Sequence, residues 1–161
     1  MNSSRILIVE SSFYPEITKE LIKGATAELI KAKLKNHIIS VPGAFEIPAA
    51  IKFSLMADKE KTLNNRFAGY IALGCVIQGE TDHYKHICSE TTRALMDISI
   101  NDTIALGFGI LTVSSLEQAK VRAYSLGEKN TGGKAALSCI KMIDLKASMS
   151  LKKSRKTNET A

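Results

Sequence analysis

The chain has 161 residues, of which 45% are hydrophobic and 24% are charged, the usual balance of a globular domain. One hydrophobic core is expected, because a chain of this length buries roughly two thirds of its unfolded surface. No apolar run approaches the roughly 20 residues that cross a bilayer. The start, MNSSRILIVE, has too short an apolar run for a signal peptide, so a cytoplasmic location is expected.

The formal net charge of +6 raises the question of a polyanionic partner such as nucleic acid. Half of this excess lies in Lys152–Ala161, which carries +3 by itself. We interpret residues 151–161 as a basic, disordered tail on a domain of residues 1–150, with no nucleic-acid or membrane partner. An odd number of cysteines without metal-ligand spacing indicates reduced thiols and no metal site: Cys75, Cys88 and Cys139.

Strand and helix patterns alternate along the chain. Short apolar runs rich in β-branched residues predict strands at Arg5–Val9, His37–Val41, Ala68–Ile77 and Thr103–Thr112. Apolar residues at helical spacing predict helices at Glu16–Lys35, Ile47–Ala57, Asp82–Ile98, Leu116–Tyr124 and Lys134–Lys146. The charged stretch Asp58–Arg66 predicts a surface loop, and Gly132-Gly133 is expected to separate the last two helices.

This alternation predicts an α/β fold, a parallel sheet with right-handed crossovers and helices on both faces. In such sheets ligands bind beyond the carboxyl ends of the strands. Two capping boxes, Ser114 with Glu117 and Ser115 with Gln118, also predict a helix start after the fourth strand. The loops in which a site is expected are therefore Glu10–Pro15, Pro42–Glu46, Gln78–His83 and Thr112–Ser115.

The segment Gln78–His83 carries the most chemistry. Gly79 lets the backbone approach a ligand, and Thr81 and Asp82 are candidate helix N-caps. Free N–H groups at a helix start attract anions, and histidine is suited to proton transfer near neutral pH. The alternative is a capped helix followed by a surface histidine at His83. His86 fits the same helix face, although a solvent-exposed or structural role remains open for it, as for His37.

Two further loops contain ligand-binding candidates. Pro42–Pro48 has a shape restricted by two prolines and a glycine, and Glu46 is suited to bind a polar ligand edge. Its alternative is a rigid turn with Phe45 packed on the core. Phe13 and Tyr14 are adjacent and cannot both face the core, so one of them is a candidate for stacking on a planar ring; surface packing is the alternative.

Other residues carry a weaker signal. Arg122 lies on a predicted helix, where it either clamps a phosphate or is solvated. Cys75 ends a strand, and we interpret it as a small buried residue. Neither a G-x-G-x-x-G fingerprint nor a Walker lysine loop is present, which disfavours dinucleotide and P-loop nucleotide sites.

Three long segments resemble the 6,7-dimethyl-8-ribityllumazine synthase family. They are VPGAFEIP (Val41–Pro48), ALGCVIQGETDHYKHI (Ala72–Ile87) and FGILTVSSLEQAKVRA (Phe108–Ala123), and the resemblance extends from Arg5 to Leu145. It implies a flavodoxin-like sandwich on a four-stranded parallel sheet. The implied activity is the condensation of 5-amino-6-(D-ribitylamino)uracil with 3,4-dihydroxy-2-butanone 4-phosphate, with release of phosphate and water. This step of riboflavin biosynthesis needs no cofactor.

The resemblance also implies a role for individual residues. His83 corresponds to the proton-transfer histidine, and Arg122 to the arginine that binds phosphate together with Gly79, Glu80 and Thr81. Phe13 matches the aromatic residue that stacks on the pyrimidine ring. The ribityl-binding turn matches Ala44, Phe45 and Glu46, and the strand end that binds the uracil matches Cys75, Val76 and Ile77. Phe108 matches the residue contributed across a subunit boundary, since family sites lie between neighbours in a homopentamer.

Two departures from the family pattern concern positive charge. Gln78 stands where the family often has Arg or Lys, and Thr131 stands where it commonly has a substrate-binding lysine. Lys129 or Lys134 is a hypothetical replacement for that lysine. The alternatives for function are an archaeal-type riboflavin synthase and a non-catalytic flavin- or lumazine-binding protein. For assembly, the length of Leu126–Gly133 favours a pentamer over a larger shell.

Overall fold

Four parallel strands form a single sheet in the order β2-β1-β3-β4 in the computed structural model, which describes residues 5–59 and 67–149. The strands are β1 (Arg5–Ser11), β2 (Lys35–Val41), β3 (Phe67–Ile77) and β4 (Leu106–Val113). The helices are α1 (Pro15–Lys31), the single 3₁₀ turn η1 (Ala44–Glu46), α2 (Ile47–Lys59), α3 (His83–Asn101), α4 (Leu116–Ala123) and α5 (Thr131–Ser148). This order is that of the first four strands of a flavodoxin-like sheet, which confirms the expected α/β class.

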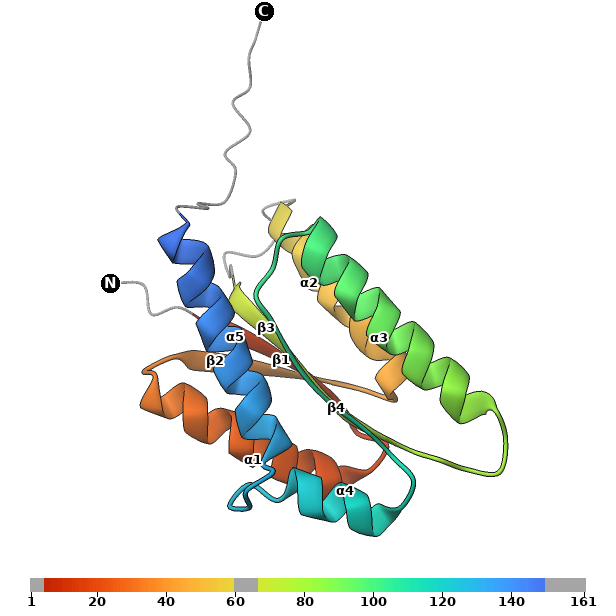
Figure 1. Cartoon of the computed structure of the whole chain (residues 1–161). Coiled ribbons are helices and arrows are strands. Elements are labelled where there is room, and N and C mark those ends of the chain that lie inside the picture. Colours follow the sequence, from red (N-terminus) through yellow and green to blue (C-terminus); the bar gives the residue numbers. More distant parts are fainter. Residues whose placement is uncertain (1–4, 60–66, 150–161) are drawn as a thin grey trace, which may run out of the picture.

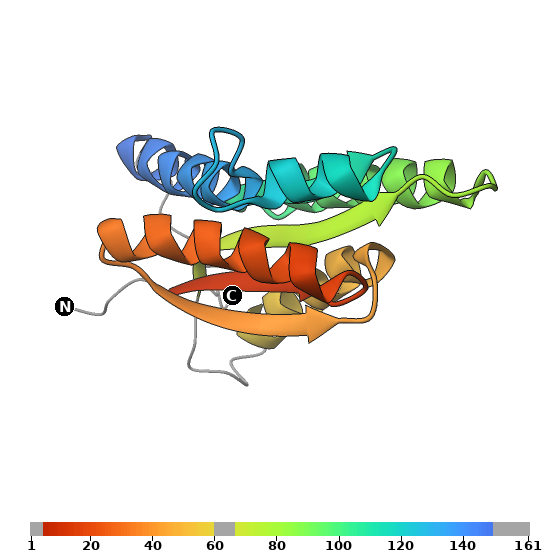
Figure 2. The same ribbon diagram turned by 90° about the horizontal axis from the view of Figure 1, so that it is seen from below.

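Helices cover both faces of the sheet. Figure 1 shows α1, α4 and α5 on one side of the strands and α2 and α3 on the other. Alternate residues of β1 supply the two cores: Ile6 and Ile8 pack under α1, whereas Leu7 and Val9 pack under α2. Because β1 is central, all four side chains are fully buried. In Figure 2 the arrowheads of β2 and β3 point to the same end of the molecule, so the loops that follow them share one edge.

Several predicted boundaries are wrong for identifiable reasons. The first helix ends at Lys31 rather than Lys35, because Lys33 adopts a left-handed backbone with φ 57° and Lys35 already belongs to β2. The fourth strand begins at Leu106 rather than Thr103, which is also left-handed with φ 52°. The first two residues of the loop predicted at residues 58–66 continue α2 instead. The rest of that loop and the predicted tail at residues 151–161 lie outside the described residues.

The glycine pair Gly132-Gly133 does not separate helices but lies inside the first turn of α5. Asn130 caps this helix by accepting a hydrogen bond from the Gly133 N–H at 2.9 Å. A Cβ on Gly132 would fall on the Leu21 carbonyl of α1, so the missing side chain permits close packing of the two helices. The sequence predicts two capping boxes at the start of α4, and the structure has its N-cap at Ser115, whose hydroxyl accepts from the Gln118 N–H at 3.2 Å.

Gly107 allows α5 to lie directly against β4, since a Cβ at this position would overlap the Ala135 backbone. We therefore expect Gly107→Ala to lower the free energy of unfolding by about 2–3 kcal/mol through overpacking. Gly79→Ala is the matched control, because nothing lies within 4 Å of its added Cβ and its φ is not positive. Urea unfolding at equal protein concentration measures both, and equal losses for the two variants would contradict this packing.

Glu20 ties α1 to the segment after α4, where its carboxylate accepts hydrogen bonds from the Ser125 N–H at 3.2 Å and the Ser125 hydroxyl at 2.9 Å. Its bond from Lys23, together with those from Ser125, lowers the pKa of Glu20 from 4.5 to about 2. A lowered carboxyl pKa stabilises the fold above the unfolded pKa, and this stability is lost as the pH falls from 4.5 toward 2.

Glu20→Gln should therefore destabilise the protein at pH 7, by no more than about 1 kcal/mol because a quarter of the side chain (25%) remains exposed. The difference from wild type should close as the pH falls from 4.5 toward 2. Glu28→Gln is the control, since Glu28 pairs with Lys31 on the same helix. Urea unfolding at pH 7 and pH 3 measures both; a difference that is constant with pH for Glu20→Gln would refute the role of its charge.

Candidate active site

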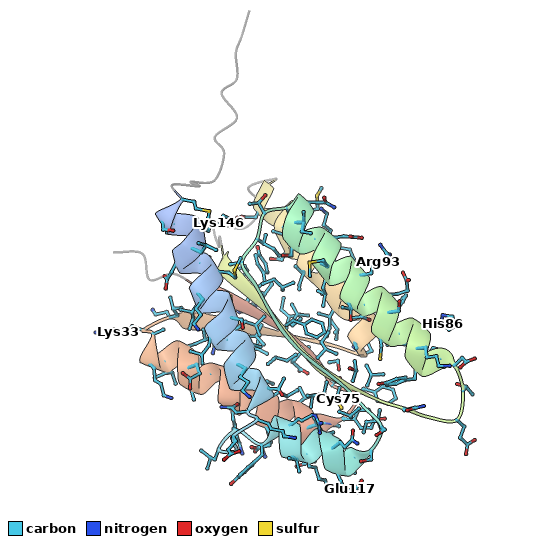
Figure 3. All side chains as sticks on the ribbon, viewed as in Figure 1. Lys33, Cys75, His86, Arg93, Glu117 and Lys146 are labelled. Carbon is cyan, nitrogen blue, oxygen red and sulfur yellow. The ribbon has the colours of Figure 1, made fainter. Side chains whose placement is uncertain are left out.

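A cavity of about 650 Å³ opens at the carboxyl ends of the strands, between the loops that follow β1, β2 and β3. Ten of the predicted site residues line it: Phe13, Ala44, Phe45, Glu46, Cys75, Val76, Ile77, Gly79, Thr81 and His83. They come from three separate stretches of the chain, which parallel pairing brings to one edge. In Figure 3, Cys75 lies near this edge and His86 lies on the first turns of α3.

The end of β3 forms the floor of the cavity. Its pairing with β1 ends at Glu10–Leu73, whereas its pairing with β4 continues to Ile77–Val113. On the side of β1, the backbone from Cys75 to Ile77 therefore extends beyond its strand partner. The N–H and C=O groups that point to this side, rather than to β4, can bind a ligand instead. Burial raises the pKa of the Cys75 thiol to about 11, so this side chain is a neutral packing group rather than a nucleophile.

In the turn after β2, Ala44 is buried in the core, whereas the side chains of Phe45 and Glu46 reach the cavity. Ala44 is buried in the core beneath α2, and the Glu46 N–H donates to the Gly43 carbonyl at 3.3 Å to close η1. The alternative of a Phe45 packed on the core is wrong, because its side chain is 56% exposed. Phe45 and Glu46 both face the cavity. The turn can therefore offer an apolar surface and a carboxylate acceptor side by side.

Phe13 and Tyr14 both line the cavity, but only Tyr14 also packs against the core. Their rings meet edge to face, with centroids 5.0 Å apart. Tyr14 packs against the core under α1, whereas Phe13 is 68% exposed and lines the cavity. An exposed ring held by a second aromatic ring is suited to stack on a planar ligand.

His83 is the first residue of α3 and lines the cavity. Asp82 occupies the N-cap position, as predicted, but its side chain makes no capping bond and instead pairs with Lys85 at 2.8 Å. The Thr81 hydroxyl accepts from the His83 N–H over a long 3.4 Å. The imidazole is thus presented at an open helix start, where it can exchange protons with a bound ligand.

Three predicted residues lie outside this cavity. Glu80 is exposed, Phe108 projects from β4 with 44% of its surface exposed, and Arg122 on α4 donates to the Gln118 carbonyl at 3.2 Å. Among the described lining residues, the carboxylates are Glu46 and Glu90, and neither Lys nor Arg is present. The walls that this chain supplies therefore lack a cation for a phosphorylated ligand.

The cavity has seven further lining residues. Four of them lie in, or on the same helix face as, segments in which the sequence predicts a site: Tyr14, Pro42, Gly43 and His86. The other three are not predicted from the sequence: Tyr84, Ile87 and Glu90. A signal existed for part of this set, because His83, His86 and Glu90 recur at helical spacing and share one flank of α3. His37 has a different role, since it stacks on Phe67 with centroids 6.1 Å apart and does not line the cavity.

A doubly wound parallel sheet with a partly apolar cavity at the carboxyl ends of its strands defines an α/β protein that binds small molecules. The family model of 6,7-dimethyl-8-ribityllumazine synthase matches residues 3–147. The chain belongs to the 6,7-dimethyl-8-ribityllumazine synthase family. Within the described ranges, no helix is both long and apolar enough to cross a membrane.

Relatives with the same name match this chain over most of their length. The synthase of Bartonella bacilliformis is 50% identical over 141 residues, covering 88% of this chain and 89% of the relative. That of Paramagnetospirillum magneticum is 40% identical over 148 residues, covering 92% and 98%. That of Afipia carboxidovorans is 46% identical over 147 residues, covering 91% and 88%. The family-model match over residues 3–147 includes every strand and helix that contributes to the cavity.

Proposed function

We propose that this chain condenses 5-amino-6-(D-ribitylamino)uracil with 3,4-dihydroxy-2-butanone 4-phosphate in the cavity at the carboxyl ends of its strands. The products are 6,7-dimethyl-8-ribityllumazine, phosphate and water, and the step is the penultimate one of riboflavin biosynthesis. The observation that carries the proposal is the convergence of Phe13, Glu46, His83 and the end of β3 in one cavity of a chain that belongs to this family.

Each part of the pyrimidine substrate has a chemically matched wall. The planar ring is placed between Phe13 and the side of the Cys75–Ile77 backbone that faces away from β4, where N–H and C=O groups match the amide-like edge of a uracil. The ribityl hydroxyls are placed at Ala44–Glu46, where the carboxylate accepts hydrogen bonds. The phosphate of the second substrate is placed at Gly79–Thr81, beside the N-terminus of α3.

The chemistry requires proton transfer more than strong activation. The ring amine attacks the ketone and loses water to give an imine. A base then removes a carbon-bound proton, which allows phosphate to leave. The resulting enol tautomerises to a ketone, and the ribitylamino nitrogen attacks this carbonyl and releases a second water as the second ring closes. We assign the proton transfer to His83, the imidazole at the phosphate end of the cavity. Most of the remaining acceleration is assigned to holding the two substrates in contact.

The missing cation supports a site completed by a second copy of the chain. Phe108 and Arg122 do not line the cavity of their own chain, and both reach the surface, where they can contact the cavity of a neighbouring chain. Large apolar side chains are also exposed on α2 and α3, including Phe53 at 72%, Met96 at 57% and Ile100 at 67%. We therefore propose a homopentamer, or a multiple of it, with sites at subunit boundaries, in the cytoplasm. In it Arg122 binds the phosphate of the adjacent site.

Mixing the two substrates with the protein should produce lumazine, detected by its fluorescence, and phosphate in equal amounts. His83→Ala should retain part of this activity, with kcat lower by about 10²- to 10⁴-fold, the range that general acid–base catalysis supplies. His37→Ala, outside the cavity, is the control. Absence of phosphate release by wild type would refute the proposed function, as would riboflavin formed from lumazine alone. A loss beyond 10⁴-fold would refute the limited role of His83.

Arg122→Ala should raise KM for the phosphorylated substrate about tenfold, as expected when a charge-assisted hydrogen bond is lost. Lys120→Ala on the same helix is the control. Co-expression of Arg122→Ala with His83→Ala chains should restore activity, since a boundary site then combines an intact His83 with an intact Arg122. An unchanged KM would remove Arg122 from phosphate binding, and a mixture no more active than its parts would place both residues in one chain's site.

A further inference from the structure

The turn Ser12–Tyr14, between β1 and α1, carries the Phe13 ring that lines the cavity. The sheet supports this turn incompletely, because the pairing of β1 with β3 ends at Glu10 and only the edge strand β2 still pairs with Ser11. The first residue of the turn then donates its N–H to the Val41 carbonyl of β2 at 3.0 Å. Backbone pairing therefore holds the turn on one side only.

Thr18, in the first turn of α1, supplies a contact from the helix. Its hydroxyl donates to the Ser11 carbonyl at 2.6 Å, and its N–H donates to the Tyr14 carbonyl at 3.0 Å. These two acceptors lie on either side of Ser12 and Phe13, so one residue bonds both ends of the turn. In Figure 2 the start of α1 lies at the edge of the sheet to which the arrowheads of β2 and β3 point.

The hydroxyl bond is the one that depends on the identity of this side chain. The N–H bond to Tyr14 is the regular bond of a helix, whereas the bond to Ser11 needs a hydroxyl at position 18. Thr18 is 3% exposed and Ser11 is fully buried, so water does not compete for it. Without the hydroxyl, the cost of an unpaired buried carbonyl favours a shift of the turn toward water. Such a shift displaces the Phe13 ring, which contacts Tyr14 but is otherwise 68% exposed.

We infer that Thr18 is a positioning residue, which holds the Phe13 ring in place for the pyrimidine substrate by bonding the end of β1 to α1. The inference rests on the proposed function for the identity of that ligand. Thr18 does not line the cavity, so it acts through the ring rather than on a substrate. A displaced ring weakens stacking on the pyrimidine, whereas His83 and the phosphate end of the cavity belong to another segment and stay in place.

Thr18→Val replaces the hydroxyl with a methyl group of similar size. We expect Kd for 5-amino-6-(D-ribitylamino)uracil alone to rise about fivefold, as for the loss of one aromatic contact, and KM for the phosphorylated substrate to stay within about twofold of wild type. Thr18→Ser keeps the hydroxyl and should bind the pyrimidine as wild type does. Thr26→Val is the matched control, since the Thr26 hydroxyl, further along α1, accepts from the Asn36 side chain at 3.3 Å; Kd should not change.

The decisive comparison uses the Phe13→Ala background, where Thr18→Val should leave Kd for the pyrimidine substrate unchanged. An equal rise of Kd in both backgrounds would overturn the inference, because the hydroxyl would then act without the ring. A Thr18→Val variant with wild-type Kd would overturn it as well. If Thr18→Val does not fold, Thr18→Ala gives the same comparison, since alanine also lacks the hydroxyl and favours the helix.

Tryptophan fluorescence separates this inference from the proposed function, because it needs no substrate. The chain contains no tryptophan, so Phe13→Trp places a single reporter on the turn. Time-resolved anisotropy should show about twofold larger nanosecond motion of this ring when Thr18→Val is added, and no change when Thr26→Val is added. Unchanged motion with Thr18→Val overturns the anchoring even in an active enzyme. Larger motion in a protein that releases no phosphate supports the anchoring while the proposed function fails.

Discussion

Parallel pairing of β1 and β3 is the constraint on which the rest of the molecule depends. It forces the loops after both strands to the same edge, together with the turn after β2. The difference in strand length then matters, because β3 continues past the last residue of its pairing with β1. Helices fill both faces of the sheet, so the carboxyl edge is where unpaired backbone and side chains from several segments can meet.

Around this edge, buried anchors alternate with open residues. Ala44 and Cys75 are buried and fix the positions of the turn after β2 and of the end of β3. Phe45, next to Ala44, and Phe13, two residues after the buried Ser11, leave more than half of their surface exposed. This arrangement keeps an apolar binding surface in place without a ligand, at the cost of leaving large rings in contact with water.

Charge distinguishes the cavity from a complete site for a phosphorylated substrate. The described walls carry Glu46 and Glu90 but neither Lys nor Arg, and Gln78 and Thr131 are uncharged. The dependence on a neighbouring chain that we propose follows from this composition. Dilution of the protein would then lower activity and stability together, because one interface would supply both the cation and the cover for exposed apolar residues.

The sequence by itself determined the alternation of strands and helices, the parallel sheet and the strand-end position of the motifs, since periodicity and turn residues are local properties. Only the tertiary structure decided that Gly132 packs inside a helix, because the reason is the Leu21 carbonyl of another helix. It likewise assigned Tyr84 and Glu90 to the cavity and left Arg122 outside it. Which side chains meet depends on register and helix packing across the sheet, and these are set by residues far apart along the chain.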